Sequence, residues 1–339
     1  MSITLLAIES SCDDTSAAII KDGEVLSNIM ATQDIHKAYG GVVPEVASRA
    51  HQANIIPVVD AAFAKAKIPK EEIDAVAFTR GPGLMGSLIV GVSFAKAFAM
   101  SRNIPIIEVN HMRAHVMAHF AEAPRPQFPF LCLTVSGGHT QILKVHSPFQ
   151  MEVIGATIDD AAGEAFDKTG KLLGLDYPAG PKIDQLAQRG KAIYSFTEPR
   201  VKDLDFSFSG LKTSILYFLK RQLKENPNFI TDNLADICAS VQERIVSILM
   251  NKLIKAYQIT GYRQVAVAGG VSANSSLRKA LREAGEHYGW ETFVPQLEYC
   301  TDNAAMIGIL AYYKYQDKQF AEQDITPDPR LKVTLNENT

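Results

Sequence analysis

The sequence has few cysteines and lacks any long apolar run, and both absences narrow the class of protein. Its 339 residues include the four cysteines Cys12, Cys132, Cys238 and Cys300, which are far apart and form no CxxC pair. This usage is typical of a reducing compartment, so we expect a cytoplasmic protein. The longest apolar candidate, Leu84–Met100, is interrupted by serine and lysine, which predicts a buried helix and not a membrane span.

The sequence also lacks an excess of positive charge, and we expect its first residues to form a strand. Residues 1–9 contain no basic region and a short apolar run, which predicts a first strand in place of a signal peptide. Lysine and arginine number 34 against 37 aspartates and glutamates, for a net charge of −3 with neutral histidines. Any contact with nucleic acid must therefore use a local basic patch or a partner protein.

The densest local group of basic residues lies between Arg200 and Lys224. It comprises Arg200, Lys202, Lys212, Lys220, Arg221 and Lys224. Such a group can contact RNA phosphates, but a charged run is also the ordinary composition of a solvated helix face.

Length and composition predict two domains with a substantial core. The chain is 47% apolar and 21% charged, as ordinary globular proteins are, and 339 residues exceed the usual size of one core. Three prolines within residues 124–129 stop a helix and stiffen the crossing, so we place a boundary there. The expected organisation is an N-terminal half over 1–126, a second half over 127–310, and a C-terminal helix with a polar tail over 311–339.

Both halves open with the same pattern of strand, tight polar turn and strand. In the first half the turn is Glu9–Ser16, and in the second it is Ser136–Thr140, each between apolar segments. The repetition predicts two like-folded α/β halves that face each other across a cleft. Small hydroxyl residues and adjacent glycines in such turns can hold phosphate, although a plain polar hairpin has the same composition.

Two histidines four residues apart follow the predicted strand 105–109. His111 and His115 would lie on one face of a helix, where both imidazoles can reach a single metal ion. His119 continues the same stripe, so spacing alone does not select two of the three, and a partly buried helix surface is the alternative. A zincin-type protease needs glutamate directly after the first histidine, but Met112 stands there.

Two further segments carry candidate binding groups. The glycines in Arg80–Ser87 and after the strand 264–268 would offer free N–H groups to an anion, or would serve tight helix packing. Asp302 is suited to cap the apolar helix that starts at Ala304, and its carboxylate could also be a hard metal ligand. The polar tail from Asp324 is expected to be loose.

Together these stretches resemble the tRNA threonylcarbamoyladenosine transferase family, TsaD, also called Gcp or Kae, over nearly the whole chain. Any one motif is weak, but all of them in family order are very specific. The motifs are Ile8–Asp13, Gly40–Glu45, Gly81–Leu84, Val135–Thr140, Asp159–Lys168, Phe208–Lys212, Ala268–Val271 and Thr301–Met306.

The resemblance implies a fold, a reaction and partners. The fold is the actin-like ATPase (ASKHA) fold, with two RNase H-like halves. The enzyme, a tRNA N6-adenosine threonylcarbamoyltransferase, would move the threonylcarbamoyl group from threonylcarbamoyl-AMP to N6 of adenosine 37 in tRNAs that read ANN codons, and release AMP. Its expected partners are a same-fold TsaB-like paralogue and a TsaE-like P-loop ATPase, with no membrane.

The resemblance also implies a site. His111, His115 and Asp302 would hold one divalent metal per subunit, iron(II) in the first place and zinc as the other candidate. The residues expected around the nucleotide-like substrate are Thr134, Val135, Ser136, Gly137, Gly138, Asp167, Gly180, Asp184 and Asn274. The N6 amine is a poor nucleophile, and our hypothesis is that Asp13 accepts its proton.

The sequence departs from the family pattern at three positions. Arg113 and Ala114 replace Glu-Gly within the histidine motif, and both are expected to point away from the metal. Ala179 replaces a glycine, which is compatible unless that residue needs a positive φ.

Three other functions compete with this interpretation. A metallopeptidase would use the histidine pair but has no base at Met112. An ATP-dependent small-molecule kinase or ATPase of the same fold would leave the histidines unexplained. A non-enzymatic scaffold would not depend on His111 or Asp302 at all.

Overall fold

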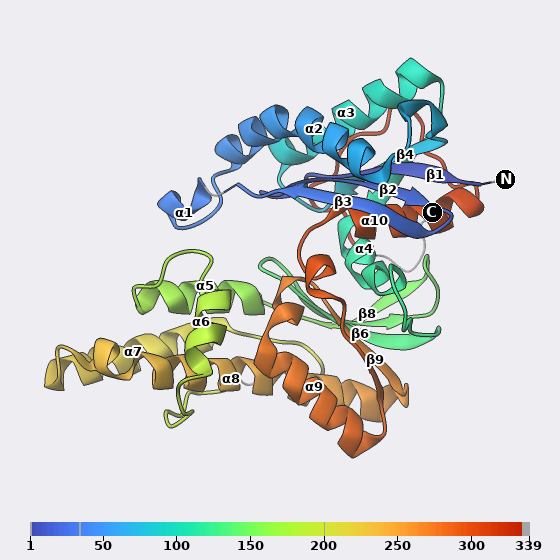
Figure 1. The fold of residues 1–339 in the computed structure, drawn as a ribbon. Helices are drawn as coiled ribbons and strands as arrows, with labels where there is room; N and C mark the ends of the chain where they lie inside the picture. The colour runs from blue at the N-terminus through green and yellow to red at the C-terminus, as the bar shows by residue number, and fades with distance from the viewer. Residues whose placement is uncertain (1, 34, 200, 334–339) are drawn as a thin grey trace. The chain divides into compact units, whose positions relative to one another are not determined.

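The computed structural model describes residues 2–33, 35–199 and 201–333. The chain forms two compact units (Figure 1). The first contains the residues up to Pro126, Ser147–Met151 and the chain from Pro295 onward, and the second contains Gln127–His146 and Glu152–Val294.

The first unit is built on a five-stranded sheet with the order β3-β2-β1-β4-β5. Its strands are β1 (Thr4–Glu9), β2 (Thr15–Lys21), β3 (Glu24–Ala31), β4 (Ala75–Gly81) and β5 (Ile106–Asn110). β2 pairs antiparallel with β1 and β3, whereas β4 runs parallel to β1 and β5. All six residues of β1 are buried, as expected for a central strand that is covered on both faces.

Helices cover both faces of this sheet. They are α1 (His36–Tyr39), α2 (Pro44–Ala66), α3 (Met85–Arg102), α4 (His111–Met117) and α10 (Ala304–Gln316), with short 3₁₀ turns η1 (Lys70–Glu72), η2 (Ala118–Phe120) and η4 (Leu297–Tyr299). Figure 1 shows α2 and α3 over one face and α4 and α10 against the other. The core under α2 and α3 joins Ile8 and Ile19 of the sheet to Val59 and Val92 of the helices.

The second unit repeats this sheet. Its order is β10-β9-β6-β7-β8, with β6 (Phe130–Val135), β7 (Thr140–Val145), β8 (Met151–Ala156), β9 (Gln264–Ala268) and β10 (Glu291–Phe293). β6 pairs antiparallel with β7 and parallel with β9, as β1 does with β2 and β4. The prediction of two like-folded α/β halves is therefore confirmed at the level of each unit's topology.

The second unit has its own helices and its own apolar core. The helices are α5 (Ala162–Leu172), α6 (Gly180–Ala187), α7 (Ser209–Glu225), α8 (Phe229–Thr260) and α9 (Ser275–Tyr288), with the 3₁₀ turn η3 (Gly270–Ala273). The core joins Leu133 of β6 and Val267 of β9 to Ile245 of α8 and Leu277 of α9. Within the described residues, none of the helices of either unit combines the length and apolar character that a membrane-spanning helix needs.

The C-terminal segment corrects two expectations. Residues 295–310 were expected in the second half, but the chain from Pro295 belongs to the first unit, where α10 packs on β1 and β2. The reason is that the first eight residues of α10 are all buried, so this apolar helix needs a sheet to cover it.

The described part of the tail after α10, which ends at Val333, is bound to the first unit and is not loose. Ala321 forms a bridge with Ile106, and the backbone N–H of Asp328 donates to the carbonyl oxygen of Arg80 at 2.9 Å. The side-chain amide of Asn110 donates to the carbonyl oxygen of Lys332 at 3.2 Å. These hydrogen bonds tie the tail to the ends of β4 and β5.

Gly81→Ala tests this docking of the tail. A Cβ at Gly81 would overlap the carbonyl oxygen of Asp328, so either the tail or the end of β4 must shift. We expect a loss of about 2 kcal/mol or more in the free energy of unfolding, measured by denaturant titration. Gly270→Ala is the control, because a Cβ there would meet no atom within 4 Å. Equal stability of the two variants would contradict the docking.

Candidate functional site

The candidate metal centre begins where β5 ends and α4 starts. Asn110 is the N-cap of α4, and its side-chain oxygen accepts hydrogen bonds from the backbone N–H groups of Met112 at 3.0 Å and Arg113 at 3.1 Å. This cap fixes the first turn of the helix, so His111 and His115 follow one above the other. His119 lies in the 3₁₀ turn η2 and is not part of the group that could hold a metal ion.

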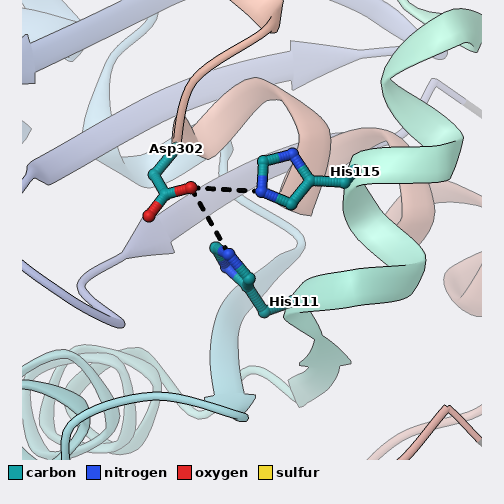
Figure 2. Close-up of side chains that lie close together, drawn as sticks. All are labelled: His111, His115 and Asp302. Atoms are coloured by element: carbon teal, nitrogen blue, oxygen red, sulfur yellow. Dashed lines mark hydrogen bonds and ion pairs between the residues drawn. The ribbon is translucent and has the colours of Figure 1, made fainter. Parts of the chain in front are cut away.

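The structure brings His111, His115 and Asp302 together (Figure 2). Asp302 Oδ1 lies 3.1 Å from His115 Nε2 and 3.4 Å from His111 Nε2. The imidazole rings are nearly perpendicular, at 85°, with centroids 4.6 Å apart. The candidate ligand atoms all lie within 4.8 Å of one another, so two imidazole nitrogens and one carboxylate oxygen could surround a single ion.

Asp302 is available for this role because its neighbour caps α10. The side-chain oxygen of Asn303 accepts from the backbone N–H of Met306 at 3.0 Å, and Asn303 has the extended backbone of an N-cap residue. The prediction that Asp302 is the cap was wrong by one residue. Its carboxylate is turned to the histidines instead.

A buried glutamate completes the surroundings of His111. Glu9 Oε2 lies 3.0 Å from His111 Nδ1, and the side chain of Glu9 is fully buried. The sequence motifs assign Glu9 no role of its own. The sequence nevertheless contains a signal for it, since Glu9 is a carboxylate at the end of the apolar strand 4–8. A charge that is buried there needs partners.

The carboxylates set the charge of this group. Burial disfavours a charged imidazole, but Asp302 and Glu9 outweigh burial and raise the pKa of His111 well above its usual range. Burial likewise disfavours an ionised Asp302, but His111 and His115 outweigh it and hold the pKa of Asp302 well below its usual range. Positive charge at the centre of the group is thus strongly favoured.

Two acids of the loop after β1 add negative charge nearby. Burial, together with the charges of Asp13 and Asp302, raises the pKa of Asp14 to about 7. Asp14 Oδ1 is buried and has no hydrogen-bond partner among the described residues. Asp13 is half-buried in the same loop, and its part as a proton acceptor stays a prediction.

In the second unit, the predicted anion-binding turn lies at the end of β6. Thr134 and Val135 are buried in the strand, whereas Gly137 and Gly138 are exposed. The turn is held by the backbone N–H of Ser136, which donates to the carbonyl oxygen of His139 at 2.8 Å. A Cβ at either glycine would meet no atom within 4 Å, so local packing leaves open space beside the turn.

Two neighbouring segments, at Gly163 and Gly269, contact the turn at the end of β6. The backbone N–H of Gly163, at the start of α5, donates to the carbonyl oxygen of Ser136 at 3.1 Å. Gly269 has a φ of 86°, and a Cβ there would lie 2.5 Å from the carbonyl oxygen of Val135. Glycine is needed at Gly269 for both its backbone conformation and this close approach.

The remaining predicted substrate residues connect the helices around these loops. Asp167 accepts from the backbone N–H of Ala179 at 2.7 Å, next to Gly180 at the start of α6. Asp184 accepts from the backbone N–H of Ser275 at 3.0 Å and from its hydroxyl at 2.6 Å. Asn274 caps α9 through Leu277 N at 3.0 Å, and its amide donates to Gln242 at 2.7 Å. The contacts gather these residues within the second unit, and their substrate roles stay predictions.

Of the three departures from the family pattern, one fits the local backbone and two lie buried in α4. Ala179 has a φ of −88°, so this position does not require glycine. Arg113 and Ala114 are both buried, at 2% and 0% exposure.

The basic group of the second unit remains a candidate contact for phosphates. Of its members, Arg200 lies outside the described residues. Lys202, Lys220, Arg221 and Lys224 are exposed, and Lys212 is half-buried on α7.

Comparison with known proteins gives consistent matches along the chain. A sequence model described as TsaD: tRNA N6-adenosine threonylcarbamoyltransferase matches residues 24–309. A protein named tRNA N6-adenosine threonylcarbamoyltransferase from Christiangramia forsetii is 60% identical over 334 residues, which cover 97% of this chain and 98% of the relative. A protein of the same name from Riemerella anatipestifer is 57% identical over 335 residues, covering 98% of each.

Solved structures show the same fold at low sequence identity. HypF from T. kodakarensis matches with a TM-score of 0.62 and 15% identity over 93% of this chain and 48% of that chain. Component A of the (R)-2-hydroxyglutaryl-CoA dehydratase of Acidaminococcus fermentans matches with a TM-score of 0.55 and 16% identity over 93% and 99%. With the repeated sheets, these likenesses confirm the predicted actin-like ATPase fold.

Asp14→Asn tests whether an acid beside the centre is held by burial and by the charges of Asp13 and Asp302 with a raised pKa. The pKa of Asp14 is raised from 3.8 to about 7, so its ionisation destabilises the folded chain increasingly as pH rises through this window. In chelator-treated protein, we expect Asp14→Asn to raise the melting temperature at pH 8 and to change it little at pH 4. A change that is the same at both pH values would contradict this charge assignment.

Proposed function

The chain belongs to the tRNA N6-adenosine threonylcarbamoyltransferase family, and we propose that it transfers threonylcarbamoyl from threonylcarbamoyl-AMP to N6 of adenosine 37 in tRNAs that read ANN codons. The single observation that carries this proposal beyond the family match is the convergence of His111, His115 and Asp302. A tRNA acyltransferase without such a group would need another means of orienting the donor.

The donor set of the centre fits one divalent metal ion. Two imidazole nitrogens and one carboxylate oxygen suit iron(II) or zinc, and three protein ligands leave coordination positions for substrate. The Nε2 atoms of both histidines are turned to the same carboxylate oxygen, which supports one shared ion. When bound, the ion supplies Lewis-acid polarisation and a template for oxygen atoms of the substrate.

The transfer itself needs positioning more than covalent catalysis. Threonylcarbamoyl-AMP is a mixed anhydride, so its carbonyl carbon is already activated. The N6 amine forms a C–N bond to this carbon, the bond to the phosphate oxygen breaks, and AMP leaves. We assign Asp13 to accept the proton from the amine.

The loops of the second unit supply groups for the AMP part of the donor. The hydroxyl of Ser136 and the N–H groups of Gly137 and Gly138 would hold the phosphate, and the open space beside both glycines supports this role. Each carboxylate oxygen of Asp184 accepts one hydrogen bond from Ser275 and keeps a lone pair for a ribose hydroxyl. Asn274 would hold the loop in place through its cap on α9.

Partners and location follow from the same proposal. The net charge of −3 favours a tRNA interface that is shared with a same-fold paralogue and a P-loop ATPase. Free cysteines throughout the chain support a reducing compartment, the cytoplasm.

Transfer of labelled threonylcarbamoyl to a tRNA transcript that carries adenosine 37 tests the reaction. With metal and both partner proteins supplied, His111→Ala should lower the rate roughly 100-fold or more, because it removes a ligand of the ion. His287→Ala, an exposed histidine on α9, is the matched control and should keep the wild-type rate. No labelling by the wild-type enzyme, with substantial ATP turnover by the chain alone, would favour the kinase alternative.

A further inference from the structure

The last residue of β1 is a carboxylate at the centre of a sheet. Glu9 follows five buried residues of the strand, and its own exposure is 0%. β1 lies between β2 and β4: Glu9 pairs with Ser16 of β2, and Ile8 before it pairs with Phe78 of β4, so the strand that leads to Glu9 is fixed on both edges. An ionised group in such a place is stable only when hydrogen-bond donors surround it.

Three donors from different segments meet this carboxylate. The backbone N–H of Ser11 donates to Oε1 at 2.5 Å, and the hydroxyl of Thr79 on β4 donates to Oε2 at 2.5 Å. The third is the imidazole of His111, whose Nδ1 lies 3.0 Å from Oε2. An ionised carboxylate only accepts hydrogen bonds, so His111 donates to Glu9 from a protonated Nδ1, and the hydroxyl oxygen of Ser11, 3.2 Å from the same nitrogen, can accept as well.

The proton on Nδ1 determines the state of the other ring nitrogen of His111, Nε2. With the proton on Nδ1, the Nε2 atom of a neutral His111 has its lone pair free, and this is the atom turned to Asp302 at 3.4 Å. His115 has no equivalent support, because its buried Nδ1 has no hydrogen-bond partner among the described residues. Only one of the two histidines is therefore anchored to the sheet by a carboxylate.

We propose that Glu9 is a positioning residue of the metal centre, which holds the His111 ring in the orientation and tautomer that present Nε2 to the ion. The inference rests on the metal centre of the proposed function. Carboxylate partners of metal-bound histidines typically contribute 10- to 100-fold in metal affinity. Here the partner also ties α4 to β1 and, through Thr79, to β4.

Glutamine cannot replace Glu9 without disturbing either Ser11 or His111. If the amide nitrogen takes the place of Oε1, it faces the N–H of Ser11, which cannot accept a hydrogen bond. If the amide nitrogen takes the place of Oε2, it donates to His111 Nδ1 and leaves the ring proton on Nε2, toward the ion. The second orientation opposes metal binding directly, and the first is disfavoured because it loses the hydrogen bond from Ser11, although the shape and volume of the side chain are kept.

Metal titration of Glu9→Gln tests the proposal. We would measure zinc affinity of the full chain by competition with a chromophoric chelator and expect a loss of 10- to 100-fold. Asp74→Asn is the matched control, since Asp74 accepts from the backbone N–H of Thr4 at the other end of β1 and should keep wild-type affinity. Wild-type affinity in Glu9→Gln would overturn the inference.

Asp302→Asn separates this inference from the proposed function. If Asp302→Asn loses zinc and Glu9→Gln does not, the metal centre stands and the role of Glu9 fails. If Asp302→Asn keeps wild-type affinity, the metal centre itself fails.

A measurement on the wild-type protein covers the case in which Glu9→Gln does not fold. In zinc-loaded protein with ¹⁵N-labelled histidine, nuclear magnetic resonance should show His111 protonated at Nδ1 and metal-bound through Nε2. A His111 ring protonated at Nε2 would overturn the assignment.

Discussion

A row of opposite charges, Glu9–His111–Asp302, in which Glu9 and His111 are buried and Asp302 is half-buried, is the interaction on which the first unit depends. It joins the end of β1, the first turn of α4 and the residue that precedes the cap of α10. These segments lie about a hundred or more positions apart along the chain, and buried charges of this kind are stable only while each keeps its partners. The row therefore adds to the burial of α10 a second interaction that holds the segment after residue 295 on the first unit, where Asn303 and not Asp302 caps the helix.

Local pattern predicted much of the architecture. The apolar segments 5–8 and 130–135 are strands because buried central strands read as continuous apolar runs, and the repeated turn after each correctly indicated two units of one topology. The histidine pair was also visible from spacing, since a helix of 3.6 residues per turn places positions four apart on one face. Spacing did not select His111 and His115 over His119, because that choice depends on the change from α-helix to 3₁₀ turn at Ala118.

What the sequence could not reveal are contacts between distant segments. The tail is held by hydrogen bonds to Arg80 and Asn110. The polar residues around Pro327 and Pro329, taken without these contacts, predict a loose segment. The place of Glu9 depends on pairing between β1 and β4, which brings Thr79 beside it. In the second unit, the closeness of Gly269 to Val135 follows from parallel pairing of β6 and β9, which no local motif encodes.

The central claim is that one divalent ion is held by His111, His115 and Asp302, and that a hydrogen bond from His111 Nδ1 to Glu9 fixes the orientation of the His111 ring. X-ray absorption at the metal edge of the loaded full-length chain tests it most directly. The account predicts scattering from two imidazole rings, with nitrogen and carboxylate oxygen ligands at about 2.0–2.2 Å and no sulfur. A sulfur ligand at about 2.3 Å, which would place Cys12 on the ion, or a spectrum without imidazole scattering would contradict it.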